Sequence, residues 1–309
     1  LTIKKLEMQA AKLLGTDMGL FVPSGTMGNL ISLLVHCPRG SEALLGDKSH
    51  TFIYEAGGIS AFGGIHSHQL KNNDDGTIEI NDIKSAIRRD NVHFPRTSLI
   101  SLENTHNMCH GTPITGDYIK LVSNITKENG LKLHIDGARL FNAAVSLDTD
   151  VKELVKDVDS VTFCLSKGLS APVGSVLCGS KNFIYEARRM RKALGGGMRQ
   201  AGIIAAAGLV SLDKMIPQLK NDHENAKRLA DGISTISGLS VNTDKIHTNI
   251  LYFSVDESKM KGSELVEKMG QHKVKFFEVS PNRFRLVTHS NISSDDVNTT
   301  LKLFDTILP

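Results

Sequence analysis

The stretch TFCLSKGLSAPVGSVLCGS, residues 162–180, decides the fold of this chain. An apolar run ends at Ser166 and Lys167, a loop of small residues follows, and a second apolar run begins at Ser175. Both runs are typical of buried β-strands, because apolar residues alternate with few polar ones between turn-forming residues. A lysine ammonium is costly to desolvate beside such strands. The position of Lys167 therefore predicts that the protein uses this amine.

Strands and helices alternate on the amino-terminal side of this stretch. Strand patterns occur at residues 19–24, 65–71, 97–105 and 131–139, and most of them are separated by helical patterns. Strands separated by helices of about 10–15 residues favour crossover units and a mostly parallel sheet. We therefore predict an α/β fold with a central sheet flanked by helices. Further helices are expected over residues 2–14, 50–64, 79–90, 117–130 and 150–157.

The pattern changes after Gly197. A long helical pattern covers residues 198–236 and is interrupted at Pro217, since proline cannot continue a helix. Two strands within 241–255, a helix over 262–270, strands over 275–280 and 283–289, and a helix from Ser294 complete the chain. We predict a large α/β domain over residues 1–210 and a smaller α+β domain over 211–309.

The composition is that of an ordinary globular protein. The chain has 309 residues, of which 40% are hydrophobic and 22% charged, and its formal net charge is +3. This balance predicts neither a nucleic-acid nor a membrane partner, and no apolar run approaches the roughly 18 residues that span a bilayer. The four cysteines show no paired spacing, so we expect reduced thiols and a cytoplasmic location. Since Leu1 already lies in a helical pattern, we also expect a preceding segment.

Three candidate groups lie at strand ends, where open α/β sheets bind ligands. Ser24, Gly25 and Thr26 begin a helix and offer backbone N–H groups to a phosphate, although the same residues form an ordinary helix cap. Asp136 ends an apolar strand, where it pairs with a pyridinium nitrogen, caps the next helix or pairs with Arg139. Lys167 is either a Schiff-base amine or a solvated lysine in a turn. Together they make a complete pyridoxal phosphate site.

Seven blocks of sequence resemble the low-specificity L-threonine aldolases, which are fold-type I pyridoxal phosphate enzymes. In chain order they are FVPSGTMGN, DKSHTFIYEAGG, LENTHN, HIDGARLFNA, CLSKGLSAPVGS, GGGMRQAGIIAAAG and RLVTH. The resemblance covers nearly the whole chain. It implies a lyase of amino-acid metabolism that cleaves L-threonine or L-allo-threonine into glycine and acetaldehyde, in threonine catabolism and glycine biosynthesis.

The resemblance also implies a role for each cofactor residue. Lys167 forms the Schiff base with pyridoxal 5'-phosphate, and Asp136 keeps the ring nitrogen protonated so that the ring accepts electrons. The phosphate binds at residues 24–26. His50 stacks on the ring face.

Two arginines and a second histidine complete the implied site. Arg139, which also belongs to the cofactor site, and Arg285 bind the substrate carboxylate, for which Arg283 is the rival in the same strand. His106 lies near the β-hydroxyl. His50, His106 and an ordered water are equally open as the base that takes the hydroxyl proton.

The family implies a dimer or a tetramer. We interpret the basic segment of residues 186–200 as a loop at a subunit contact, from which Arg199 contributes to the partner's site. His66 and His68 alternate on a strand like a metal pair, but no acidic partner is near in sequence, so no metal is predicted.

Three other interpretations stay open. A β-eliminating lyase, a transaminase or a decarboxylase can use the same scaffold, because fold does not determine reaction. The second interpretation is an inactive relative retained for binding or assembly, but the presence of Lys167 and Asp136 argues against it. A nicotinamide-dependent oxidoreductase is the third, but no GxGxxG motif follows a strand.

Overall fold

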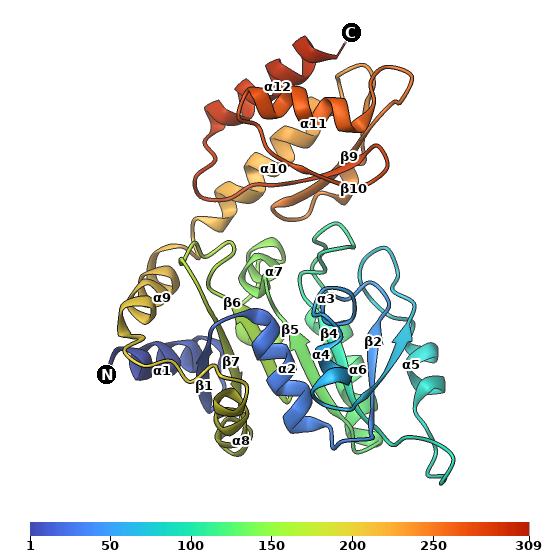
Figure 1. Cartoon of the computed structure of the whole chain (residues 1–309), viewed down its shortest axis with the longest axis vertical. Helices are drawn as coiled ribbons and strands as arrows, with labels where there is room; N and C mark the ends of the chain where they lie inside the picture. Colours follow the sequence, from blue (N-terminus) through green and yellow to red (C-terminus); the bar gives the residue numbers. More distant parts are fainter. Residues whose placement is uncertain (309) are drawn as a thin grey trace. The chain divides into compact units, whose positions relative to one another are not determined.

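The computed structural model describes residues 1–308, which form two compact units (Figure 1). The first unit comprises Leu1–Cys109 and Pro113–Ile216. The second comprises His110–Thr112 and the residues from Pro217 onward. The boundary at Ile216 and Pro217 lies close to the predicted division between residues 210 and 211, and it coincides with the proline that interrupts the helical pattern.

A mostly parallel seven-stranded sheet forms the first unit's framework, in the order β1-β7-β6-β5-β4-β2-β3 (Figure 1). Only β7 runs antiparallel to its neighbours, β1 and β6. The strands are β1 (Met18–Val22), β2 (Glu42–Gly46), β3 (His66–Leu70), β4 (Thr97–Glu103), β5 (Lys132–Asp136), β6 (Ser160–Cys164) and β7 (Ser175–Gly179).

Every residue of β6 and β7 is buried, as the opening stretch predicts. Strands that helices cover on both faces become almost uniformly apolar, because neither face meets water. Lys167 follows β6 and is half-buried, in the loop that leads to β7. The parallel strands bring the carboxyl ends of β2, β4, β5 and β6 to one edge of the sheet, and β1 ends there as well.

Helices flank this sheet (Figure 1). The first helix packs against β1 and against α9, and it ends at Gly15, whose left-handed φ of 68° favours glycine. The helices of the first unit are α1 (Thr2–Leu14), α2 (Gly25–His36), α3 (His50–Ile53), α4 (Gly58–Ala61), α5 (Ile80–Ala86), α6 (Gly116–Glu128), α7 (Leu140–Ser146), the 3-10 helix η1 (Val151–Leu154), α8 (Lys181–Ala193) and α9 (Gly202–Lys214).

Three expectations differ from these elements. The helix predicted over residues 50–64 is two short helices, α3 and α4, because Ala56 and Gly57 both adopt positive φ between them. The helix predicted over 150–157 is the single 3-10 turn η1. The apolar helix α7, which begins after Arg139, lies outside the predicted helical ranges.

The second unit is a four-stranded antiparallel sheet with three helices, in the strand order β10-β11-β9-β8. Its last helix begins with a capping box, in which Ser293 and Asp296 satisfy each other's backbone N–H groups. The elements are α10 (Leu219–Ile233), β8 (Leu239–Val241), the 3-10 helix η2 (Thr243–Lys245), β9 (Ile250–Val255), α11 (Gly262–Gln271), β10 (Phe277–Ser280), β11 (Arg283–Val287) and α12 (Ser294–Ile307).

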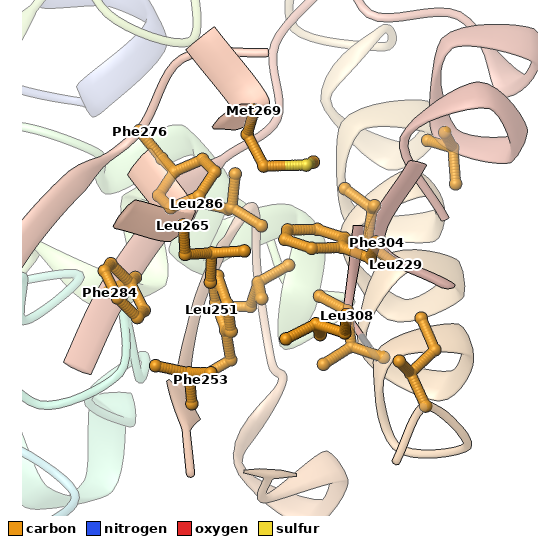
Figure 2. Packing of buried hydrophobic residues seen from close by; sticks show 14 of the residues in the cluster. Leu229, Leu251, Phe253, Leu265, Met269, Phe276, Phe284, Leu286, Phe304 and Leu308 are labelled. Atoms are coloured by element: carbon orange, nitrogen blue, oxygen red, sulfur yellow. The ribbon is translucent and has the colours of Figure 1, made fainter. Parts of the chain in front are cut away.

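An aromatic cluster forms the core of the second unit (Figure 2). The ring of Phe253 on β9 lies 5.0 Å from that of Phe284 on β11 and 5.4 Å from that of Phe304 on α12, measured between centroids. Phe284 therefore faces the helices, and the alternation of a strand places Arg283 and Arg285 on the opposite face of β11.

Taken singly, none of the described helices is long and apolar enough to cross a membrane, although α9 and α10 jointly meet that length and composition.

Candidate active site

A cavity of about 240 Å³ opens at the carboxyl edge of the first unit's sheet. It brings together six of the predicted site residues: Ser24, Gly25, Thr26, His50, Asp136 and Lys167. The remaining lining residues are Pro23, Asn29, Glu55, Ala138, Cys164, Ser166, Pro172, Val173 and Gly174. Since these residues follow different strands, the sheet itself assembles the site.

The amino-terminus of α2 forms one end of the cavity. The cap interpretation of Ser24 is confirmed, since its Oγ accepts the N–H of Met27 at 3.1 Å. The N–H groups of the first helical turn have no partner within the helix and favour an anion. A Cβ at Gly25 would lie 3.0 Å from the sulfur of Cys164, so the close approach of α2 to the end of β6 leaves no room for a side chain.

Asp136 lies at the end of β5 and is only 3% exposed. Its Oδ1 accepts the N–H of Ala138 at 3.1 Å, and its Oδ2 accepts the side-chain amide of Asn29 at 2.9 Å. Burial first, then the nearby charges of Glu103 and Glu55, raise the pKa of Asp136 to about 7. A buried carboxylate of this kind is costly to ionise alone, so it fits a ligand that brings a positive charge.

His50 is the first residue of α3 and is paired with an acid. Its Nδ1 lies 3.0 Å from Oε1 of Glu55, and its backbone N–H donates to Oε2 of Glu103 at 2.6 Å. The hydrogen bond to Glu55 raises the pKa of His50, while burial acts against it. The imidazole is therefore held in place and made more basic by a carboxylate within the same segment.

Sequence reasoning missed Asn29, Glu55 and Glu103, which hold Asp136 and His50 in position. Asn29 is 1% exposed in the mostly apolar helix α2, and Glu55 is 6% exposed. A polar residue inside an apolar pattern is the signal that points to each of them, because buried polar groups are normally bonded.

The donor set suits a ligand with an anionic group, a cationic ring and a carbonyl. The helix terminus of α2 offers N–H groups, Asp136 offers a buried carboxylate, and Lys167 offers an amine to the same cavity. These are the three groups that pyridoxal 5'-phosphate requires, so the residues fit this cofactor.

The comparisons with known proteins agree with this geometry. Residues 1–256 match the sequence profile of the beta-eliminating lyases. A low-specificity L-threonine aldolase of Arabidopsis thaliana is 46% identical over 307 residues, which are 98% of this chain and 86% of that protein. The low specificity L-threonine aldolase of Escherichia coli K12 is 40% identical over 296 residues, or 96% of this chain and 86% of that protein. The chain belongs to the low-specificity L-threonine aldolase family.

The fold is also similar to that of solved threonine aldolases. A threonine aldolase structure from Leishmania major superposes with a TM-score of 0.80 at 22% identity, covering 97% of this chain and 89% of that one. This likeness confirms the predicted fold-type I architecture, with its mostly parallel central sheet. Pyridoxal 5'-phosphate is the cofactor, and the chain is a lyase.

Four of the predicted site residues do not line the cavity of this threonine aldolase family member. His106, just after β4, is buried, and burial lowers the pKa of its imidazole, so the ring is neutral. Arg139 is half-buried at the N-cap of α7. Arg199 is exposed beyond α8, and Arg285 belongs to β11 of the second unit. The roles expected of all four stay predictions.

The loop expected at residues 186–200 is wrong in its first half. Residues up to Ala193 belong to α8, and the glycine-rich loop begins only after that helix. Two of the basic residues bind the buried Glu7 of α1: Arg188 Nη2 lies 3.3 Å from Glu7 Oε2, and Arg191 Nη1 lies 3.7 Å from Oε1. These ion pairs give the basic residues a structural partner within the first unit.

His66 and His68 do have an acidic neighbour, contrary to the sequence interpretation. Glu42 on the adjacent strand is fully buried, 3.6 Å from Nε2 of His66 and 3.5 Å from Nδ1 of His68. The same carboxylate pairs with Arg88 at 3.4 Å, which balances its charge. A second possible ligand set, formed by His50, Glu55 and Asp136, has its atoms within 4.8 Å of one another but belongs to the cofactor cavity. The absence of a metal stays a prediction.

Proposed function

We propose that this chain cleaves L-threonine and L-allo-threonine into glycine and acetaldehyde, with Lys167 as the residue that binds the cofactor. The observation that carries the proposal is the meeting of Lys167, Asp136 and His50 at one cavity in a chain related to threonine aldolases. When bound, pyridoxal phosphate supplies an electron sink for the carbon that loses the aldehyde.

The residues of the chain do the remaining work. Asp136 would hold a proton on the ring nitrogen through its charge, and the first turn of α2 would bind the phosphate. The amine of Lys167 would bind the carbonyl group of the cofactor. Because these residues come from three different strand ends, they would fix the cofactor in one orientation.

The proposal is tested by incubating the holoenzyme with L-threonine and measuring glycine and acetaldehyde. Equal amounts of both products are expected, and the same assay with L-allo-threonine measures the preference at Cβ. Accumulation of the pyridoxamine form of the cofactor without acetaldehyde would instead identify a transaminase. Release of 2-oxobutanoate with ammonia would identify a β-eliminating lyase.

We also propose His50 as the base that accepts the β-hydroxyl proton. The contact with Glu55, at 3.0 Å, supports this choice, because a carboxylate stabilises the imidazolium that forms when the proton is accepted. His50 lines the cavity, whereas His106 does not.

The exchange of Glu55 for glutamine tests His50 as the base through the pH dependence of kcat/KM. Since the bond to Glu55 raises the pKa of His50 and burial lowers it, Glu55→Gln leaves burial dominant and lowers that pKa. His50 is an active base only above its pKa. The acid limb of kcat/KM should therefore move to lower pH by about one unit, with a lower plateau. An acid limb that does not move would mean that another group is the base.

Arg285 is proposed to bind the substrate carboxylate. Its place in the block RLVTH, which resembles the threonine aldolases, supports this choice over Arg283. The guanidinium carbon of Arg283 lies 5.0 Å from the centre of the Tyr252 ring. A planar guanidinium binds a carboxylate through two parallel hydrogen bonds, which a lysine cannot form.

Arg285→Lys should raise KM for threonine by roughly tenfold to a hundredfold, because the second hydrogen bond to the carboxylate is lost. The absorbance spectrum of the bound cofactor should not change. Arg283→Lys is the matched control in the same strand and should leave KM nearly unchanged. A large KM for Arg283→Lys with a normal Arg285→Lys enzyme would assign the carboxylate to Arg283.

Self-association as a dimer or tetramer also stays a proposal. Exposed apolar side chains support it, since soluble monomers seldom display many large ones together. Phe52, Ile53 and Tyr54 are exposed on and after α3, and Phe62 follows α4. Contribution of Arg199 to a partner's site rests on this assembly. A cytoplasmic location is likewise proposed, and it is supported by four buried free cysteines.

A further inference from the structure

Asn29 joins the two carboxylates of the active site. Its side-chain Nδ2 donates to Oδ2 of Asp136 at 2.9 Å and to Oε1 of Glu55 at 2.9 Å. A side-chain amide has two N–H hydrogens, so each carboxylate receives one of them. The residue lies in α2 and is 1% exposed, so water does not compete for either bond.

A buried chain of hydrogen bonds holds this amide in one orientation. Nε2 of His134 lies 3.2 Å from Oδ1 of Asn29, and since this oxygen can only accept, Nε2 carries the proton. Burial lowers the pKa of His134 to about 3, so its ring is neutral. The Nδ1 atom then accepts the Ser160 hydroxyl at 2.9 Å, and the oxygen of Ser160 lies 2.9 Å from Nε2 of His36. The amide therefore cannot flip without breaking this chain.

The amide matters because two carboxyl groups lie close together out of water. Oxygens of Asp136 and Glu55 and a nitrogen of His50 all lie within 4.8 Å of one another. Two buried carboxylates at such a distance normally share a proton, because their charges repel. Hydrogen bonds to the ionised forms oppose this proton uptake.

Asp136 is near the point at which it loses its charge. The charged groups that face it are Glu103 at the end of β4, Glu55 after α3, His50 of α3 and Lys167 after β6. Burial and the two glutamates raise its pKa to about 7, while Lys167 and His50 lower it. The loss of one hydrogen bond to the ionised carboxylate therefore raises the pKa of Asp136 further and favours its neutral form.

We propose that Asn29 is a positioning residue that favours the ionised form of Asp136 while it holds the carboxylate of Glu55 beside His50. The carboxylate for the cofactor's ring nitrogen and the carboxylate behind His50 are thus held by one side chain. Asn29 therefore connects Asp136, which serves the cofactor ring, to Glu55, which supports the proposed base His50. This inference rests on the proposed cofactor site, but it needs no assumption about the substrate.

The test replaces Asn29 by leucine, which has nearly the same shape and no donor. The carboxyl carbon of Asp136 is followed by ¹³C NMR in the full chain without cofactor, and Asp136→Asn assigns the signal. The titration midpoint should rise by about one pH unit or more in Asn29→Leu. Ser160→Ala breaks the chain beyond His134 but leaves both amide donors present, so it should raise the midpoint less than Asn29→Leu does. An unchanged midpoint in Asn29→Leu would refute the proposal.

The affinity for pyridoxal phosphate gives a second measurement. At about pH 7, Asn29→Leu should bind the cofactor roughly tenfold more weakly, since more of Asp136 is neutral. The deficit should shrink toward pH 9, as Asp136 becomes ionised again. A purely structural defect would weaken binding equally at every pH, and this result would overturn the proposal.

A third variant covers the case in which the leucine variant does not fold. Asn29→Ser keeps one donor and should raise the midpoint by less than leucine does. If only this variant folds, an unchanged midpoint overturns the proposal. Both titrations are made without substrate, so their failure would leave the cleavage of threonine untouched.

Discussion

Replacing Lys167 by alanine should abolish the visible absorbance of the lysine-bound cofactor and nearly all turnover. Lys167 is the lysine that lines the cavity, in the loop between the buried strands β6 and β7. Its removal deletes the nucleophile that binds the carbonyl carbon, and the methyl group of alanine is not a nucleophile. The loss should amount to several orders of magnitude in kcat. Pyridoxal phosphate should still bind, more weakly, through Asp136 and the start of α2.

The absorbance spectrum of the enzyme, recorded without substrate, measures the loss of the lysine-bound cofactor directly. Lys181→Ala is the matched control, because Lys181 is exposed at the start of α8 and lies outside the cavity lining. It should leave both spectrum and turnover normal. If Lys167→Ala keeps the visible band, another lysine binds the cofactor and the assignment is wrong.

Exchange of Asp136 for asparagine should lower turnover by orders of magnitude while the cofactor stays bound. The amide has nearly the size of the carboxylate but lacks the charge that holds a proton on the ring nitrogen. A difference of one pKa unit corresponds to about 1.4 kcal/mol, and a buried ion pair shifts a pKa by several units. The ring then accepts electrons poorly, so kcat falls more than cofactor affinity does.

The same exchange should make the cofactor-free protein more stable above neutral pH. Burial raises the pKa of Asp136 from 3.8 to about 7, so between these values the folded chain holds a proton that the unfolded chain has lost. The contribution of Asp136 to stability therefore falls as pH rises through this range, by up to about 4 kcal/mol. Asparagine does not titrate, so this loss is absent in the variant.

Urea unfolding of the cofactor-free chains between about pH 4 and pH 8 measures this slope. The stability of Asp136→Asn relative to the parent should increase with pH and level off above about pH 7. Asp82→Asn, on an exposed position of α5, is the control and should not change the slope. Parallel stability curves for the parent and Asp136→Asn would show that the carboxylate carries no burial penalty.

Local signals in the sequence predicted much of the fold. The apolar runs around Lys167 became the fully buried strands β6 and β7, and Ser24 is the N-cap of α2. Such features depend on neighbours within a few positions along the chain. Where they failed, as between α3 and α4, the reason was a backbone conformation: Ala56, an ordinary helix former, has a positive φ of 53°.

The basic segment before Gly195 shows how tertiary contacts correct a local interpretation. The sequence indicated a loop at a subunit contact, but Arg188 and Arg191 lie within α8 and pair with Glu7, which is remote in sequence and only 6% exposed. Glu7 meets these arginines because α1 and α8 both pack against β1.

The sequence by itself determined the chemical groups of the site: a lysine after one strand, an aspartate after another and a helix start rich in small residues. Only the tertiary structure decided their charge states. Asn29 meets Asp136 across 107 positions of the chain, and the high pKa of Asp136 arises because α2, β4 and β5 exclude water from it. Dielectric environment and charge separation are properties of the assembled core, so no local pattern of residues contains them.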